Sequence, residues 1–557
     1  MPHATGPERR RWGARALVGG LLALFAAQAW LAAHRDSVTI DEFAHLPVGL
    51  YALATGDLSL DPINPPHTRM LAALPVELAA PVFSPPAGAN EWALGYHLMQ
   101  ANAARYHELY LPARAAIIAL TLLLGILVAL WAHELYGANS AVVAVFLFAF
   151  SPAMLAHGHL VTLDASGALG FTATAWATWR LLERASLRAA LATGAALGIA
   201  ALLKLSGIVL VAVVPAVVLV RALRERDRSG WRWAGLLGVV MLTAILVINA
   251  GYGFSGTLTP LTRARLADGG ALAQLRDAAP WLRLPLPVSF VDGIDMVLNV
   301  GKQQEPTYFL AGELSSRGWW YYHLAAFALK TSLPVLLLAL GCLAHALLRG
   351  GMGPREYALW IPIVCLFTSN TLFNSLQIGV RHALPVYPLL FVLVSPRVAH
   401  LLAGWARGGR DRALAAAAAA LLAWHAAGTL AVAPRYLQFC NELAGGSEGG
   451  YRWLIDSNID WGQDLIRLRE YLQRERIDRV SLAYFGRVNP VVYGIEFHSL
   501  ERDSRGIAVI SATFLMGRPY LWYLGGRSRW VPSQTYAWLR EREPIARVGS
   551  LFVYRLD

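Results

Sequence analysis

The chain has 557 residues, of which 56% are hydrophobic and only 15% are charged, and its mean hydropathy is +0.44. This composition excludes an ordinary soluble globular protein, and repeated apolar runs of about 20 residues predict an integral membrane protein instead. The formal net charge of +12 is spread over short loops between the apolar runs, so it indicates membrane orientation and argues against a nucleic-acid partner.

Taken in chain order, the apolar runs predict about eleven transmembrane helices. The first run follows a basic leader but is longer than a typical signal sequence, so we interpret it as a retained span. The arginine-rich loops 180–188, 221–232, 345–356 and 404–412 all fall on the same side as that leader, which predicts a cytoplasmic N-terminus. The expected spans are 14–33, 112–133, 139–157, 160–182, 187–204, 206–221, 232–252, 321–347, 356–373, 382–398 and 413–433.

Three long segments are predicted on the opposite, outer side: 34–111, 253–320 and 434–557. The first contains an amphipathic stretch after two prolines, 67–80, which is typical of a helix lying in the membrane interface. The tail has three predicted strands, 479–486, 506–515 and 550–556, and a predicted helix over 460–475 with Asp460 as its N-cap. We therefore expect a transmembrane domain, 1–433, and a small outer α/β domain, 434–557.

Two adjacent carboxylates in TIDEFAHLP follow the first span directly. Thr39 and Glu42 match a capping box at the start of a helix, which explains Glu42 by local structure alone. Asp41 is free to project from the first turn, and His45, four residues on, lies on the same helix face and could pair with it. A carboxylate beside a membrane interface can act as a general base towards an acceptor hydroxyl or as a metal ligand.

Further charged residues are predicted at the same outer face. Asp164 lies near the start of the fourth span, Lys204 lies at a tight hairpin between the fifth and sixth spans, and Arg381 and His382 open the tenth. An acid in an apolar run indicates a functional site, although a helix-start acid is the structural alternative. The two cations could hold a lipid phosphate, whereas side chains that snorkel to the interface are the structural alternative.

Several of these segments resemble the GT-C membrane glycosyltransferases. The resemblance is greatest to glycosyltransferase family 39 and its relatives, the branch with protein O-mannosyltransferases and the lipid A aminoarabinose transferase. Residues 39–75 resemble the first outer loop of that branch, with its acid pair, G-D and N-P-P in order. LVTLDASGAL is similar to its second acidic site, LLKLSG to its hairpin lysine and VRHALPVYPLLF to its late arginine-containing span. The resemblance covers residues 14–400.

The resemblance implies that the transmembrane domain is all-α, polytopic and of the GT-C fold. It also implies a polyprenyl-phosphate-linked sugar as donor and inverting transfer to a hydroxyl acceptor at the outer membrane face. Asp41 would act as general base, Asp164 and Glu42 would orient the reactants, and Lys204, Arg381 and His382 would bind the lipid phosphate. The same resemblance suggests six residues that contact substrate: His45, Asn64, Arg69, Tyr308, Trp319 and Tyr322.

A second block, YLQFCNELAGGSEGGYRWLIDSNIDWGQDL, resembles a segment found in a bacterial subset of these proteins. Its acids Asp456, Asp460 and Asp464 recur every four residues, which favours one helix cap plus a solvated helix face, and its function stays open.

We expect no cofactor, with a divalent metal at Asp41 and Asp164 as an alternative. The expected partners are the lipid-linked donor, membrane lipid and a protein, lipid or glycan acceptor, in a bacterial inner membrane. Three other functions remain open: a transporter or flippase for a lipid-linked sugar, a glycan-binding scaffold without catalysis, and a ligase that moves a whole glycan from a diphosphate carrier. A transporter would favour charges at the bilayer midplane, whereas the predicted charges gather at one face.

Overall fold

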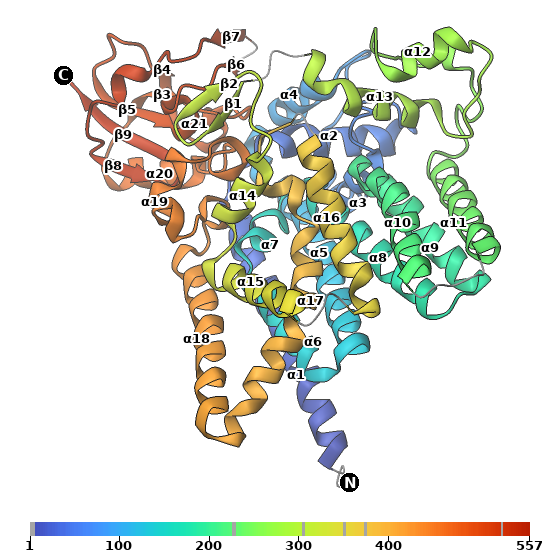
Figure 1. Cartoon of the computed structure of the whole chain (residues 1–557). Coiled ribbons are helices and arrows are strands. Elements are labelled where there is room, and N and C mark those ends of the chain that lie inside the picture. The colour runs from blue at the N-terminus through green and yellow to red at the C-terminus, as the bar shows by residue number, and fades with distance from the viewer. Residues whose placement is uncertain (1–5, 225–229, 304–306, 349–352, 373–375, 525–526) are drawn as a thin grey trace.

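The computed structural model describes residues 6–224, 230–303, 307–348, 353–372, 376–524 and 527–557. Long apolar helices form a bundle beneath a layer of shorter outer helices and a C-terminal domain, and the two chain ends lie at opposite ends of the molecule (Figure 1). Parts of two predicted basic loops, 225–229 and 349–352, lie outside the described residues, as does residue 373 at the end of the ninth predicted span.

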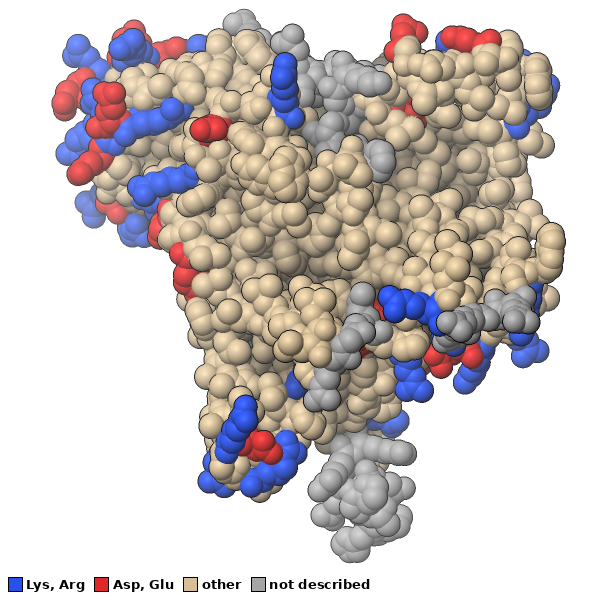
Figure 2. Space-filling model, viewed as in Figure 1, with Lys and Arg blue, Asp and Glu red and all other residues tan. Residues whose placement is uncertain are grey.

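The helices of the bundle bear out a multi-pass membrane protein. Within the described ranges, six helical segments are long and apolar enough to cross a membrane. Charged side chains gather over the C-terminal domain and along the lower edge of the molecule, with a mostly uncharged belt between them (Figure 2). The six segments are Trp12–Arg35, Ala103–Tyr136, Leu205–Arg224, Gly230–Gly251, Val386–Arg407 and Gly409–Val432.

Two predicted spans differ from the structure. The stretch 139–157 is broken into α6 (Ala138–Ala149) and α7 (Pro152–His157), and α6 rises only about 18 Å at 1.5 Å per residue, too little to cross the hydrocarbon core. The stretch 321–347 is a pair of helices, α14 (Tyr322–Lys330) and α15 (Leu333–Leu348), bent by 117°. The remaining bundle helices are α8 (Asp164–Glu183), α9 (Leu187–Leu203) and α16 (Tyr357–Leu372).

The first outer segment folds into three helices that pack on the bundle: α2 (Ile40–Thr55), α3 (Pro66–Glu77) and α4 (Glu91–Ala101). α3 begins at the predicted proline pair and exposes Leu71, Leu74 and the following Leu78, as expected for a helix at a membrane interface. α2 and α3 approach closely at Gly49, where a Cβ would lie 2.3 Å from the carbonyl oxygen of Arg69. The second outer segment contains α12 (Ala271–Ala278), α13 (Val288–Gln303), β1 (Tyr308–Leu310) and β2 (Glu313–Ser315).

The C-terminal domain is built on a mixed five-stranded sheet of order β4-β3-β5-β9-β8. β3 pairs in parallel with β4 and β5, whereas β9 pairs antiparallel with β5 and β8. α20 (Leu465–Arg474) buries its apolar side chains, and one hydrophobic core cluster continues from the bundle into this domain. The strands of the sheet are β3 (Arg479–Ala483), β4 (Glu496–Ser499), β5 (Gly506–Ser511), β8 (Ala546–Val548) and β9 (Leu551–Leu556), and a hairpin adds β6 (Tyr520–Leu524) and β7 (Arg527–Val531).

Candidate active site

The capping box predicted at the start of α2 is present. The Thr39 amide donates to the Glu42 carboxylate at 3.0 Å, and this fixes the first helical turn that carries Asp41. Sequence reasoning missed a third member, Arg114 of α5 (Tyr106–Tyr136), which is fully buried and donates to both Glu42 oxygens at 2.7 and 2.8 Å. Arg114 also binds the carbonyl oxygens of Ala33, Asp36 and Ser37, so it ties the end of α1 (Gly6–Arg35) to the start of α2.

Glu42 holds the scaffold together instead of facing a reactant. Its two oxygens accept from Arg114, from Thr39 and from the Val161 amide, and the side chain is fully buried. Burial alone would raise the pKa of Glu42, but Arg114 and these hydrogen bonds hold it below its usual value. Every lone pair is engaged, so the geometry departs from the predicted role of Glu42 in orienting reactants.

Four charged side chains from distant parts of the sequence meet at the outer end of the bundle. Asp164 begins α8 and accepts from Lys204 Nζ at 2.6 Å, and Lys204 is the residue that ends α9 at the predicted hairpin. Asp41 accepts from Arg381 Nη1 at 2.5 Å, and the same nitrogen lies 3.8 Å from Asp164. Asp164 is nearly buried, whereas Asp41 and Lys204 each keep about a fifth of the side chain exposed, at 22% and 20%. The centre therefore contains two carboxylates and two cations in one connected cluster.

A glycine gives Lys204 its place in this cluster. A Cβ on Gly167, one turn into α8, would lie 2.8 Å from Cδ and 2.9 Å from Cβ of Lys204. The LDASG segment thus supplies both the carboxylate and the room for its cationic partner.

The C-terminal block DSNIDWGQDL forms one wall of the cluster. The guanidinium of Arg381 lies over the Trp461 ring at 4.6 Å, and Trp461 itself is 1% exposed. The Trp461 carbonyl accepts from the Ile40 amide at 3.1 Å, next to Asp41 in sequence. Ser37 bonds the same block through the Gly462 and Gln463 carbonyls.

The same block also holds the segment that leads into Arg381. Asn458 accepts from the Val380 amide at 2.9 Å, and Ser457 donates to the Ile378 carbonyl at 2.6 Å. One ten-residue block therefore fixes the chain directly before Asp41 and directly before Arg381. The block lies hundreds of residues after Asp41 in sequence, and the only signal for these contacts in the sequence was the unexplained block itself.

The three aspartates of the block are buried, which corrects the prediction of a solvated helix face. Asp460 is not a helix cap, because it accepts from the Thr513 amide at 3.0 Å and from Ser550 at 3.1 Å in the sheet domain. Burial raises the pKa of Asp460 to about 7. Asp464, directly before α20, accepts from Ser550 and pairs with Arg467 at 2.7 Å. These contacts dock the block onto the sheet.

The predicted pair between Asp41 and His45 is replaced by a different contact. His45 Nδ1 lies 3.1 Å from the Val161 carbonyl, and burial lowers the pKa of His45 to about 4. His382 lies beside the cluster, with its ring 5.8 Å from that of His323, and its Nε2 is buried without a hydrogen-bond partner among the described residues.

Asn64 and Arg69 shape the loop before α3 instead of facing the cluster. Arg69 is buried and pairs with Asp61 at 2.7 Å, and the Asn64 side chain donates to the same carboxylate at 3.1 Å. Burial raises the pKa of Asp61 to about 6. The predicted contact of Asn64 and Arg69 with substrate therefore has no support in this geometry.

The three predicted aromatic residues have different surroundings. The Tyr322 hydroxyl accepts from Asn458 at 3.2 Å, which connects it to the block that carries Trp461. The Trp319 amide donates to Gln377 at 2.8 Å. Tyr308 is buried in β1, with no hydrogen-bond partner for its hydroxyl in the part of the chain that the structure describes. Tyr322 is thus connected to the block that forms one wall of the cluster.

The alternative of a divalent metal at Asp41 and Asp164 stays a prediction. Across the described ranges, no group of three or more His, Cys, Asp or Glu side chains has the arrangement to hold a metal ion. Asp41 and Asp164 instead direct oxygens at Arg381 and Lys204. Both carboxylates are thus paired with cationic side chains in the structure.

Comparisons with known proteins agree with the resemblance found in the sequence. Residues 98–248 match the family model described as dolichyl-phosphate-mannose-protein mannosyltransferase, and this segment contains Asp164 and Lys204. A comparison with curated proteins gives no match. Among solved structures, ArnT from Cupriavidus metallidurans bound to undecaprenyl phosphate is 14% identical, with a TM-score of 0.48 over 96% of this chain and 97% of that chain. The apo oligosaccharyltransferase of Archaeoglobus fulgidus is 11% identical, with a TM-score of 0.44 over 94% and 74% of the two chains.

Proposed function

We propose that the protein is a membrane glycosyltransferase that moves a sugar from a polyprenyl-phosphate carrier to a hydroxyl acceptor. The observation that carries the proposal is the cluster of two carboxylates and two cations at the outer end of the bundle. The match of residues 98–248 to a family of lipid-phosphate-dependent mannosyltransferases supports the same chemistry. The positive-inside pattern supports an outer, extracytoplasmic location for the site.

The cations would bind and stabilise the leaving phosphate. Arg381 presents a planar fork suited to phosphate oxygens, and Lys204 supplies a point charge beside it. Both groups lie next to Asp164, whose negative charge keeps them in place when no other anion is bound. Preorganised charges of this kind stabilise the negative charge that develops as the phosphate leaves.

Asp41 would act as the general base. The acceptor oxygen attacks the anomeric carbon, its proton passes to the Asp41 carboxylate, and a new carbon–oxygen bond forms. The bond from the anomeric carbon to the phosphate oxygen breaks, and its electron pair leaves with the lipid phosphate towards Arg381 and Lys204. A single displacement of this kind inverts the anomeric configuration.

The proposal is tested by transfer of radiolabel from a panel of polyprenyl-phosphate sugars, with purified protein in lipid and a mixture of hydroxyl acceptors. Asp41→Asn removes the base with little change of shape, and we expect transfer to fall by about 10²- to 10⁴-fold. Donor binding should be strengthened, because the substitution frees Arg381. Glu77→Gln is the matched control, since Glu77 is an exposed acid in the same outer segment.

Each outcome decides between functions. Transfer by the parent and by Glu77→Gln, with its loss in a folded, donor-binding Asp41→Asn variant, supports the glycosyltransferase with Asp41 as base. Equal transfer by parent and Asp41→Asn excludes that role. Donor binding without transfer for every sugar favours a transporter or a scaffold.

A further inference from the structure

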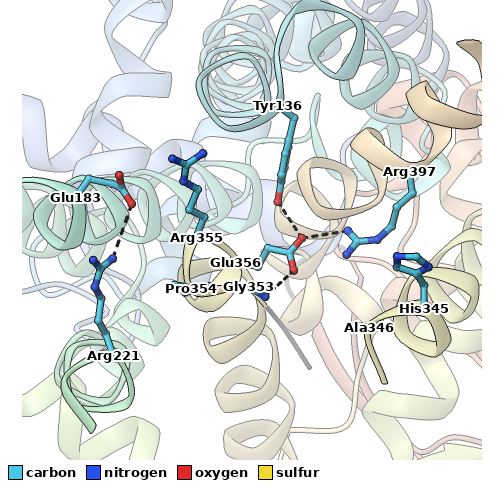
Figure 3. A pocket seen from close by; sticks show the side chains of 10 residues that line it. All are labelled: Tyr136, Glu183, Arg221, His345, Ala346, Gly353, Pro354, Arg355, Glu356 and Arg397. Atoms are coloured by element: carbon cyan, nitrogen blue, oxygen red, sulfur yellow. Dashed lines mark hydrogen bonds and ion pairs between the residues drawn. The ribbon is translucent and has the colours of Figure 1, made fainter. Parts of the chain in front are cut away.

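A second charged site lies at the end of the bundle opposite the active site. A cavity of about 590 Å³ opens there between the ends of several helices (Figure 3). α8 starts at Asp164 and has Glu183 as its last residue, so its 20 residues separate the two sites by about 30 Å along the helix. The cavity is lined by Tyr136, Glu183, Arg221, His345, Ala346, Gly353, Pro354, Arg355, Glu356 and Arg397.

The lining is built around a buried carboxylate. Glu356 accepts from the Tyr136 hydroxyl at 3.3 Å, from Arg397 at 3.2 Å and from the Gly353 amide at 3.4 Å, as the dashed lines in Figure 3 show. Glu356 is thus already neutralised by a cation from α17 (Val386–Leu402). Arg397 keeps a buried Nε without a hydrogen-bond partner among the described residues.

The remaining charge in the cavity is positive. Arg221, in the last turn of α10 (Leu210–Arg224), forms an ion pair with Glu183 at 3.8 Å. Arg355 is exposed and has no ion pair with any residue that the structure describes. Among the described lining residues, three guanidinium groups and one imidazole therefore meet two carboxylates, and this excess of positive charge suits an anionic ligand.

The surroundings of the cavity indicate that this anion carries acyl chains. α10 exposes Leu219 and Leu223 on the same turns as Arg221, at 57% and 68%. α15 exposes Leu347 and Leu348 next to the cavity, at 70% and 87%. Helices with such apolar surfaces in a membrane protein face lipid, so the cavity opens beside the bilayer.

We propose that this cavity binds the phosphate headgroup of an anionic phospholipid in the leaflet opposite the active site, which the arginine distribution predicts to be the cytoplasmic one. Basic pockets between transmembrane helices on that side are suited to anionic headgroups. The guanidinium groups of Arg221 and Arg355 contact the phosphate, and the acyl chains lie against the exposed leucines. This site is independent of the proposed transfer reaction.

The test counts lipids bound to the full-length protein. Purified protein in a neutral detergent is titrated with an equimolar mixture of phosphatidylglycerol and phosphatidylcholine, and bound lipids are counted by native mass spectrometry. The parent should retain phosphatidylglycerol preferentially. The double variant Arg221→Gln/Arg355→Gln should bind it about 30-fold more weakly, the loss expected for two arginines at a membrane surface.

Two controls keep the result interpretable. Arg188→Gln removes an exposed arginine at the start of α9, and phosphatidylglycerol binding should be unchanged. The second control, Arg221→Lys/Arg355→Lys, keeps both positive charges and should retain most of the phosphatidylglycerol binding. Such retention shows that the protein tolerates substitution of both arginines, so the loss in the glutamine variant reports the lost charge. Equal retention of the two lipids, or equal loss in Arg188→Gln, would overturn the proposal. Competition by glycerol phosphate as strong as that by phosphatidylglycerol would assign the cavity to a soluble phosphate and refute the lipid.

Discussion

The contact between Trp461 and Arg381 gives the sharpest prediction about the active site. Trp461→Leu removes the indole face that lies 4.6 Å from the guanidinium carbon. A desolvated cation–π contact of this kind contributes about 0.5–2 kcal/mol. If Trp461 positions Arg381, binding of a polyprenyl phosphate should weaken by roughly 2- to 30-fold.

The substitution also empties space in a buried site, so loss of stability must be separated from loss of positioning. The assay is therefore a double-mutant cycle in which polyprenyl-phosphate affinity is measured for the parent, Trp461→Leu, Arg381→Lys and the double variant. Lysine keeps the charge but loses the planar fork, so Trp461→Leu should matter much less in that background. Thermal unfolding of each variant in lipid shows whether the chain is still folded.

Trp453→Leu provides a matched control, because Trp453 is 40% exposed in the same C-terminal segment and the cation–π contacts of the described residues pair Arg381 with Trp461 instead. It should leave the affinity for polyprenyl phosphate unchanged. An equal loss of affinity for Trp461→Leu in the arginine and lysine backgrounds would refute the positioning role of Trp461. Such a result would leave the block as a general support of the fold.

Two further predictions concern the scaffold of the site. Arg114→Met leaves Glu42 buried without its cation, which should lower the free energy of unfolding by about 3–5 kcal/mol. Adding Glu42→Gln to this variant should recover part of the lost stability. Both changes are measured by denaturation in detergent. Asp460 has a pKa of about 7 in the folded protein, above the value of about 3.9 in an unfolded chain, so the folded state binds this proton more tightly. The stability that this proton contributes should be complete below about pH 4 and be lost as the pH rises to about 7. In Asp460→Asn, the dependence of the thermal unfolding temperature on pH over this range should be weaker than in the parent. An unchanged slope in Asp460→Asn would assign the pH dependence to another group.

Residues of the centre that stand out from an apolar background could be found from the sequence. Asp164, Lys204 and Arg381 each interrupt or border a hydrophobic run, and such charges are costly unless something compensates them. Their location at one membrane face followed from the alternation of spans and basic loops. The structure brings these three side chains and Asp41 together, whereas their chemical roles stay predictions.

Local rules failed where a distant partner decides the outcome. Thr39 and Glu42 form the capping box that their spacing predicts, but nothing near them in sequence points to Arg114, which lies within the apolar helix α5. Asp460 precedes a helix and matches a cap, yet its partners come from the sheet domain more than 50 residues away. Tertiary hydrogen bonds outweighed the local preference at that position.

The predicted count of eleven spans is not confirmed, for a related reason. The segment that contains α6 and α7 is apolar throughout, and hydropathy alone cannot show that Ser151 and Pro152 end one helix and begin another inside the bundle. Ser151 accepts from the Met154 amide and caps the short second helix. Buried helices need not span the bilayer, because their neighbours cover them.

In the proposed reaction, the pairing within the cluster would connect donor binding to activation of the base. In the structure, the Asp41 carboxylate is bound to Arg381, so the guanidinium already occupies one of its oxygens. A lipid phosphate that engages Arg381 would compete with Asp41 for the same nitrogen. Donor binding would thereby release the base at the moment when the leaving group is in place, and an acceptor would meet an active carboxylate only when a sugar is ready to receive it. The stronger donor binding expected for Asp41→Asn tests this competition directly, and weaker binding would contradict it.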